Sequence, residues 1–232
     1  MDINKYDYTL VEESDVQSFQ ESGITDLFKV LCKGLYHCTS IENYYKIVED
    51  GFLRPNEGQF NFTFPQSENS FGYSKGCISL FDFESTREEY AISQHMKWRG
   101  FFICWKPATI LLNFCHQFCK DKLIPNSSRP RPGDKNKNYK NAIPYVEVWY
   151  PEPIPVKAIQ NRIIVCPGKD INGKIYFRQY DKDDLSNFEN DLVSIINEER
   201  NLKRKKGTVS PKSPLSMKDI DRLSMEDFRR KT

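Results

Sequence analysis

The first clear pattern along the chain is a helix, a strand and a second helix between residues 23 and 51. GITDLFKVLCKG spaces its apolar residues for one helical face and ends at Gly34, a typical helix stop. The strand LYHCT follows directly. Ser40 can cap the next helix, and Gly51 closes it. We expect the two helices to bury Leu27, Val30, Leu31, Ile41, Tyr44, Tyr45, Ile47 and Val48.

The middle of the chain alternates a long polar stretch with short apolar runs. Residues 56–74 are rich in Asn, Ser, Gly and aromatic residues without a steady period, which predicts a long loop. KGCISLFDF is predicted to form a strand, ESTREEYAISQHMKW a helix and GFFICWKP a buried strand. ATILLNFCHQFCKDKLI fits either a helix or a strand, and we favour a helix.

The last third of the chain predicts three β segments and a long helix. AIPYVEVWY alternates as a strand does, RIIVC is a second β segment, and KIYFRQY follows an Asn-Gly turn. An amphipathic helix that packs on the sheet comes next, because helical spacing relates Leu185, Phe188, Leu192, Ile195 and Ile196. These elements predict an α+β domain over residues 1–206.

Residues 207–232 have the composition of a disordered linker, with low hydrophobicity, Ser-Pro dipeptides and many charges. Within them, LSMKD and LSMED form a near repeat in which each Ser can cap a short helix. Residues 214–230 are therefore a candidate docking segment, either for a partner such as an antitoxin or chaperone or for the chain's own domain. Plain disorder is the alternative interpretation.

Composition describes one large globular domain: 38% of the 232 residues are hydrophobic and 28% are charged. No run of about 20 apolar residues is present, and the first residues do not resemble a signal peptide, so we expect a cytoplasmic protein with no membrane partner. Seven scattered cysteines favour reduced thiols over a disulfide framework. Cys115, His116 and Cys119 are close together, but no second ligand pair has zinc spacing, so we assign no metal.

The net charge of +2 conceals an uneven distribution of charge. SRPRPGDKNKNYKN carries five basic residues against a lone Asp134, and RNLKRKK is a second basic run. Segments of this kind can bind phosphates. A solvated loop and a soluble tail are the alternative interpretation of the same residues.

Three separated segments together resemble the ADP-ribosyltransferase superfamily, in the branch with a His-Tyr-Glu signature that includes diphtheria-type toxins and poly(ADP-ribose) polymerases. LYHCTSIENYYKIVEDGFLRP is similar to the family's strand with Leu, Tyr or Trp, His and Gly and to its following helix. FGYSKGCISLFDFESTREEY is similar to the strand and helix start of the second motif, and YVEVWYPEPIPVKAI to the strand with the catalytic Glu. The resemblance spans roughly residues 33–166. It implies a split β-sandwich with peripheral helices, and NAD as co-substrate.

By this resemblance Glu147 is the catalytic residue. Cleavage of the bond between nicotinamide and ribose develops an oxocarbenium-like sugar, which a neighbouring carboxylate can stabilise. Glu147 also interrupts an apolar strand, where an ionised carboxylate without a partner would be costly. A strand glutamate that simply faces solvent is the alternative interpretation.

The resemblance also implies a set of NAD-binding residues. His37 would hydrogen-bond a hydroxyl of the nicotinamide ribose, because a neutral imidazole both donates and accepts. Tyr90 would stack on the cationic nicotinamide ring, and Arg87 would pair with the pyrophosphate. A core histidine, a core tyrosine and a solvated arginine are the alternatives. The other candidates are Cys38, Thr39 and Ser79.

Two positions depart from the family pattern. Cys38 stands where the family has Gly, and Ile78 stands where it has Tyr, although a shift of the alignment could bring Ser79 or Tyr73 to that position. The alternative function is therefore a catalytically degenerate module that binds a nucleotide or RNA.

The acceptor is predicted from the loop before Glu147, which meets the acceptor in this superfamily. Its basic and aromatic residues suit phosphates and bases, so a nucleic acid is favoured over a protein. Enzymes of this kind resemble bacterial or phage toxins of conflict, toxin-antitoxin and defence systems. The candidate acceptor-binding residues are Arg129, Arg131, Lys135 and Tyr145.

Overall fold

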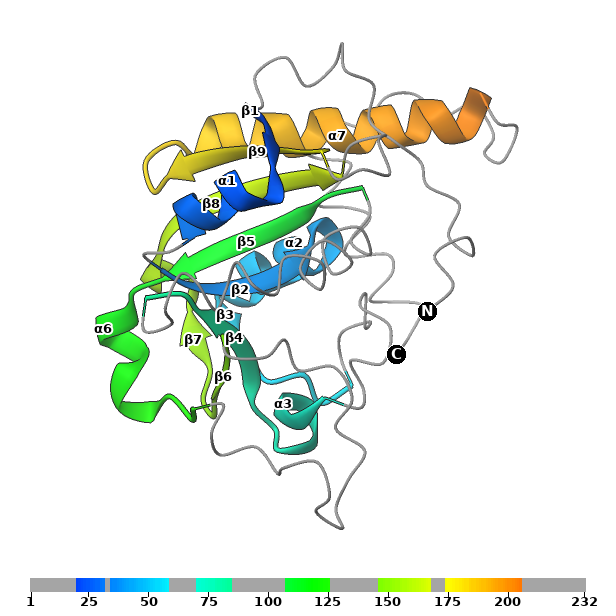
Figure 1. Cartoon of the computed structure of the whole chain (residues 1–232). Helices are drawn as coiled ribbons and strands as arrows, with labels where there is room; N and C mark the ends of the chain where they lie inside the picture. The colour runs from blue at the N-terminus through cyan, green and yellow to red at the C-terminus, as the bar shows by residue number, and fades with distance from the viewer. Residues whose placement is uncertain are drawn as a thin grey trace.

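The computed structural model describes residues 20–31, 34–58, 70–84, 107–125, 146–167 and 174–205. Its centre is a seven-stranded sheet with the order β1-β9-β8-β5-β2-β4-β6, in which all neighbouring strands are antiparallel (Figure 1). The strands of this sheet are β1 (Gln20–Gly23), β2 (Leu35–Ser40), β4 (Ile78–Asp82), β5 (Thr109–Phe114), β6 (Glu147–Tyr150), β8 (Ile159–Pro167) and β9 (Lys174–Asp181). A second, two-stranded sheet pairs β3 (Phe52–Leu53) with β7 (Ile154–Pro155).

The described helices are α1 (Ile24–Leu31), α2 (Ile41–Asp50), α3 (Phe71–Ser74), α6 (His116–Cys119) and α7 (Leu185–Lys205), with short 3-10 turns at Lys120–Lys122 and Val156–Ala158. The predicted α+β class is confirmed, because helices surround a mostly antiparallel sheet. None of these helices combines the length and the apolar character that a membrane crossing requires.

Two apolar clusters cover the two faces of the large sheet. On one face, which we call the α2/α7 face, Ile41, Tyr44 and Ile47 of α2 and Phe188, Leu192 and Ile195 of α7 pack on strand residues such as Leu35, Leu80, Leu112 and Val148. On the other, the α1 face, Leu27, Phe28 and Leu31 of α1 pack on strand residues such as Tyr36, Phe81 and Ile163. The centre of the sheet is therefore buried on both sides, which explains why the central strand β5 is a nearly continuous apolar run.

Helix α2 begins and ends as its sequence predicts. The hydroxyl of Ser40 accepts a hydrogen bond from the amide of Asn43 (3.1 Å), which satisfies one of the free amides of the first turn. Gly51 ends the helix with a φ of 76°, a conformation that costs glycine little, and its amide bonds to the carbonyl of Val48. The carbonyl of Gly51 then accepts from Val156 (2.9 Å), so the small β3–β7 sheet is tied to the end of α2.

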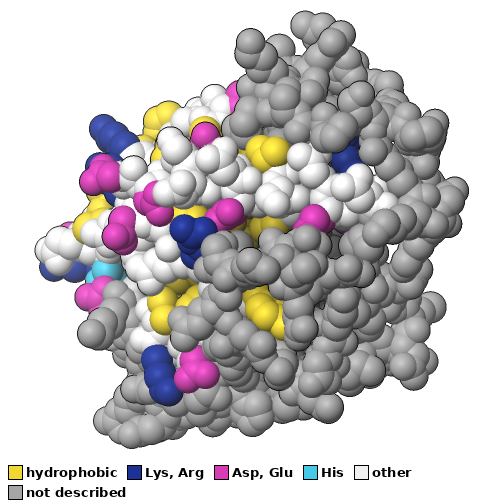
Figure 2. Space-filling view, turned by 90° about the horizontal axis from the view of Figure 1, so that it is seen from above, with side chains coloured by type: hydrophobic (Ala, Val, Ile, Leu, Met, Phe, Trp, Pro, Cys, Tyr) yellow, Lys and Arg dark blue, Asp and Glu magenta, His cyan; other side chains and the backbone are white. Residues whose placement is uncertain are grey.

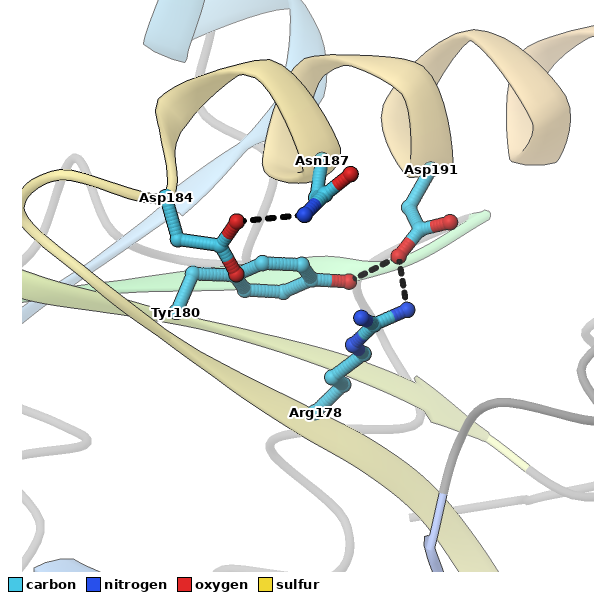
Figure 3. Close-up of polar contacts among 5 residues, drawn as sticks. All are labelled: Arg178, Tyr180, Asp184, Asn187 and Asp191. Atoms are coloured by element: carbon cyan, nitrogen blue, oxygen red, sulfur yellow. Dashed lines mark hydrogen bonds and ion pairs between the residues drawn. The ribbon is translucent and has the colours of Figure 1, made fainter.

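A polar cluster ties α7 to β9 (Figure 3). The side chains of Arg178 and Tyr180 point from β9 toward α7, where both donate to the same carboxylate oxygen of Asp191. Burial and the bond to Asp191 raise the pKa of Tyr180, so the phenol stays protonated and donates. At the start of the helix the Asn187 side chain donates to Asp184 (2.5 Å).

Arg162 on β8 is a buried cation among apolar side chains. It is 6% exposed, lies on the α2/α7 face opposite Leu112, and has its guanidinium carbon 5.7 Å from the centre of the Phe188 ring. Its Nε and Nη1 atoms are buried, and no described group lies within hydrogen-bond distance of either. The nearby guanidinium partly offsets the rise that burial gives to the pKa of Tyr44. Burying a charge is costly unless polar partners offset the loss of water.

The structure corrects several predictions. ATILLNFCHQFCKDKLI is not one helix, because residues 109–114 form the central strand β5 and only residues 116–119 form helix α6. Val48, expected to be buried, is 40% exposed. The long loop predicted over residues 56–74 contains the short helix α3. The strands β1, β3 and β7 were not predicted, since each is only two or four residues long and carries little pattern.

Other predictions fall outside the described residues. The helix and strand expected between residues 85 and 106 lie there, and so does the tail of residues 207–232 with its near repeat. Helix α7 ends at Lys205, so the predicted domain boundary near Lys206 stays a prediction.

Candidate functional site

The three segments that carry the family resemblance lie on adjacent strands. β2 carries His37, β4 carries Ser79 and β6 begins at Glu147, and β4 lies between the other two. β2 pairs with β5 over all six of its residues but with β4 only through Leu35 and Tyr36. The sheet therefore opens between β2 and β4 immediately before His37.

His37 fills the start of this opening. Its Nδ1 atom lies 3.0 Å from the backbone oxygen of Ser79. Because a carbonyl oxygen only accepts hydrogen bonds, Nδ1 carries the proton and donates. Burial lowers the pKa of His37 from 6.5 to about 4, and the bond to Ser79 opposes this only in part. The ring is neutral near pH 7, and its Nε2 atom is left as a hydrogen-bond acceptor.

The low pKa of His37 predicts a dependence of stability on pH. Between about pH 6.5 and about pH 4 the unfolded chain binds a proton at His37 and the folded protein does not. The neutral, buried His37 therefore makes its full contribution to the free energy of unfolding above about pH 6.5, and this contribution is lost as the pH falls toward about 4. Each unit of difference in pKa corresponds to at most about 1.4 kcal/mol of unfolding free energy.

Urea unfolding of the wild type and of His37→Gln, at pH values on both sides of this window, measures the effect. Gln keeps an N–H that can donate to Ser79 but does not titrate. We expect a shallower loss of stability in the variant as the pH falls. Identical slopes for the two proteins would contradict the low pKa.

Glu147 is a buried carboxylate at the start of β6. It is 5% exposed and lies opposite Phe81 of β4. The indole Nε1 of Trp149 donates to its Oε1 oxygen at 3.3 Å. The prediction that this glutamate is buried in a strand is confirmed, and the alternative that it simply faces solvent is wrong.

The strand register decides which side chains share a face. Directly opposed residues of antiparallel strands point to the same face, and successive residues of one strand point to opposite faces. Tyr36, Phe81 and Glu147 are opposed in turn across β2, β4 and β6, so Glu147 points to the α1 face. His37 follows Tyr36 and is opposed to Leu112, so it points to the α2/α7 face. The roles that the resemblance implies require both side chains to reach the ribose of one NAD molecule, but the register directs them to opposite faces.

The remaining candidate residues that the structure describes are also divided between the two faces of the sheet. Ser79 and Cys38 point to the α1 face with Glu147, whereas Thr39 points to the α2/α7 face with His37. Burial raises the pKa of the Cys38 thiol well above its usual value, so Cys38 is a protonated apolar side chain. Thr39 is buried in the sheet.

The other candidates lie outside the described residues. They are Tyr90, Arg87, Arg129, Arg131, Lys135 and Tyr145. Acidic and basic side chains are interspersed over the described part of the face in Figure 2. That part of the surface does not distinguish a nucleic acid acceptor from a protein, and the expectation of a nucleic acid rests on the sequence of the basic loop.

Two residues near Glu147 were missed in the sequence. Trp149 lies two residues after Glu147 on the same strand, a spacing that places both on one face. Gly72 of α3 lies so close to this face that an added Cβ would be 2.6 Å from the Ser79 Oγ and 2.8 Å from the Trp149 Cδ1. The strand alternation could have identified Trp149, but nothing in the sequence placed Gly72 there.

The residues considered for a metal do not converge on one point. The two ring nitrogens of His116 face different carboxylates, with Nε2 3.5 Å from Asp82 and Nδ1 3.8 Å from Glu84. Among the described ranges no group of three or more His, Cys, Asp or Glu side chains is arranged to hold a metal ion.

Comparison with known proteins adds no identification: no family model, no curated protein and no solved structure matches the chain. Function is therefore inferred from the residues of this chain and their arrangement.

Proposed function

We propose that the protein is an NAD-dependent ADP-ribosyltransferase with a split β-sandwich fold. The observation that carries the proposal is the adjacency of β2, β4 and β6, the strands that bear the three motif segments. His37 and Ser79 are separated by 42 positions in the chain, and Glu147 lies further along still, yet the strands that carry them are neighbours in the sheet. The separation of β2 from β4 and the second small sheet also support a split architecture.

His37 supports the NAD-binding part of this proposal. Its Nδ1 proton is engaged by Ser79, and its Nε2 atom can accept a hydrogen bond from a ribose hydroxyl. The bond to Ser79 holds the ring orientation before the ligand arrives, which reduces the entropic cost of binding.

Glu147 supports the chemical step. In the proposed reaction the bond between the ribose anomeric carbon and nicotinamide breaks, and its electron pair neutralises the nicotinamide ring. A nucleophilic oxygen or nitrogen of the acceptor bonds to the same carbon and loses a proton. Positive charge develops on the ribose in between, and a carboxylate in a site of low dielectric constant stabilises that charge.

A second candidate function is a non-catalytic module of the same fold that binds a nucleotide or RNA. The register favours it, since His37 and Glu147 point to opposite faces of the sheet. Ile78, at the motif position for Tyr, is buried in the apolar cluster on the α2/α7 face. A Tyr ring that stacks on nicotinamide is therefore replaced at this position by a core residue.

For the acceptor we propose a nucleic acid in preference to a protein, and for the setting a cytoplasmic toxin of a conflict or defence system. The basic residues Arg129, Arg131 and Lys135 carry the first proposal, and the superfamily resemblance carries the second. Residues 214–230 are proposed to dock an antitoxin or a chaperone.

Incubation of the purified protein with NAD tests the two functions. One arm uses NAD labelled in nicotinamide and measures release of the free base. A second arm uses NAD labelled in the adenosine part, with RNA, DNA and protein supplied separately, and measures transfer by mass analysis. Release with transfer to RNA or DNA is the expected result. Binding of NAD without release would select the non-catalytic module, and neither binding nor release would refute the enzyme and leave a module that binds RNA or another nucleotide.

A further inference from the structure

The side chain of Trp149 makes a specific contact with Glu147. Trp149 is fully buried, lies on the same face of β6, and directs its indole N–H at the Glu147 carboxylate (3.3 Å). A buried carboxylate is stabilised in its ionised form by a donor of this kind. Trp149 lies in the third motif segment, but the resemblance assigns it no role.

Both the backbone and the indole of Trp149 are held by neighbouring residues. The backbone of Trp149 forms two hydrogen bonds with Ile124, at 2.8 and 3.0 Å, on the outer edge of β6. Across the other edge it is opposed to Ser79. The ring packs with Cys77 and Ile124 and abuts the backbone of Gly72 in α3, where even a methyl group would lie 2.8 Å from Cδ1. The donor atom therefore has a defined position before any ligand binds.

We propose that Trp149 is a positioning residue that holds the Glu147 carboxylate in one orientation, with Gly72 of α3 as the surface that fixes the indole. Its role in catalysis rests on the proposed function, whereas the contact itself does not. Preset orientation matters because a catalytic group contributes fully only near its productive geometry.

An isosteric variant tests the contact without removing the ring. Benzothienylalanine at position 149 replaces the indole N–H by sulfur and keeps the bicyclic shape, and Trp149→Phe is the genetically simpler variant. The control is Tyr150→Phe, since the neighbouring Tyr150 packs in the cluster on the opposite face.

The first readout needs no enzymatic activity. The chain has three Trp residues, so Trp149→Phe identifies the indole N–H signal of residue 149 in an NMR spectrum. This signal is expected to change position in Glu147→Gln, because the oxygen that accepts from the indole then belongs to a neutral amide. An indole signal unaffected by Glu147→Gln would overturn the proposal.

The second readout is the rate of nicotinamide release. Loss of the N–H is expected to lower kcat by about tenfold, to leave the KM for NAD nearly unchanged, and to move the acidic limb of the pH profile upward. Tyr150→Phe should leave kcat and the pH profile as in the wild type. If the wild type releases no nicotinamide, the proposed function fails while the NMR result still decides the Trp149 contact. An active enzyme whose pH profile is unchanged by loss of the N–H would refute the positioning role alone.

Discussion

Glu147→Gln is expected to lower nicotinamide release from NAD by about 10²- to 10³-fold, the loss usual for removal of one preorganised electrostatic group. The amide has the shape of the carboxylate and keeps an oxygen that can accept from Trp149. The variant therefore removes the negative charge while preserving the local packing. Single-turnover measurement of nicotinamide release, with binding of NAD measured separately, distinguishes lost chemistry from lost affinity.

A matched control is available on the same segment. Glu152 is exposed and pairs with Lys122 at the surface, so Glu152→Gln changes the net charge equally without touching the site. Its rate should equal that of the wild type, because exposed ion pairs contribute little. Nicotinamide release that persists in Glu147→Gln would show that the Glu147 carboxylate takes no part in the reaction. The orientation of Glu147 away from His37 would then explain that result.

Arg162→Met is expected to raise the free energy of unfolding by up to about 4 kcal/mol, the upper end of the range found when well-packed apolar side chains replace buried ion pairs. The guanidinium of Arg162 is removed from water, and its Nε and Nη1 atoms meet no described partner. The contact with the Phe188 ring offsets only part of that cost. Met can fill the same space beside α7 without a polar group to satisfy.

Arg178 on the neighbouring strand β9 differs from Arg162 because its charge is paired with a carboxylate. Its guanidinium donates to Asp191 at 3.0 Å, so Arg178→Met removes a paired charge and is expected to lower stability. Urea midpoints of the two variants, followed by circular dichroism, should therefore move in opposite directions. A fall in the midpoint for Arg162→Met would mean that Arg162 has a bound partner in solution.

The segment from β2 to Gly51 could be predicted from sequence because its signals are local. Ser40 and Gly51 satisfy the ends of α2 through bonds to residues three positions away, which a short window contains. Val48 was misjudged for the same reason: helical spacing identifies an apolar side but not how much of it another element covers. Only the tertiary arrangement decides that coverage.

Strand β5 could not be distinguished from a helix by its sequence. Residues 109–114 are buried on both faces of the sheet, so they are mostly apolar and lack the alternation that identifies a half-buried strand. The strand is central because β2 and β8 lie on either side of it, which is a property of the whole fold.

The sequence predicted which strands lie together at the candidate site, but not the face of the sheet to which each side chain points. Motif segments indicated which strands meet, and β2, β4 and β6 are adjacent. The direction of each side chain depends on register, and one position along a strand reverses it. Glu147 and His37 therefore share a region of the sheet while pointing to different sides, and no single segment of sequence contains that information.

The pairing of β1 with β9 has a consequence for biosynthesis. Gln20 lies opposite Phe177, so β1 cannot pair in the sheet until β9 has been synthesised. Closing so long a loop is slow, and until it closes α1 exposes an apolar side whose partners include β9 residues Ile175 and Phe177. We therefore expect the nascent chain to be prone to aggregation, with a yield that depends on holdase chaperones able to shield α1 until β9 has been synthesised.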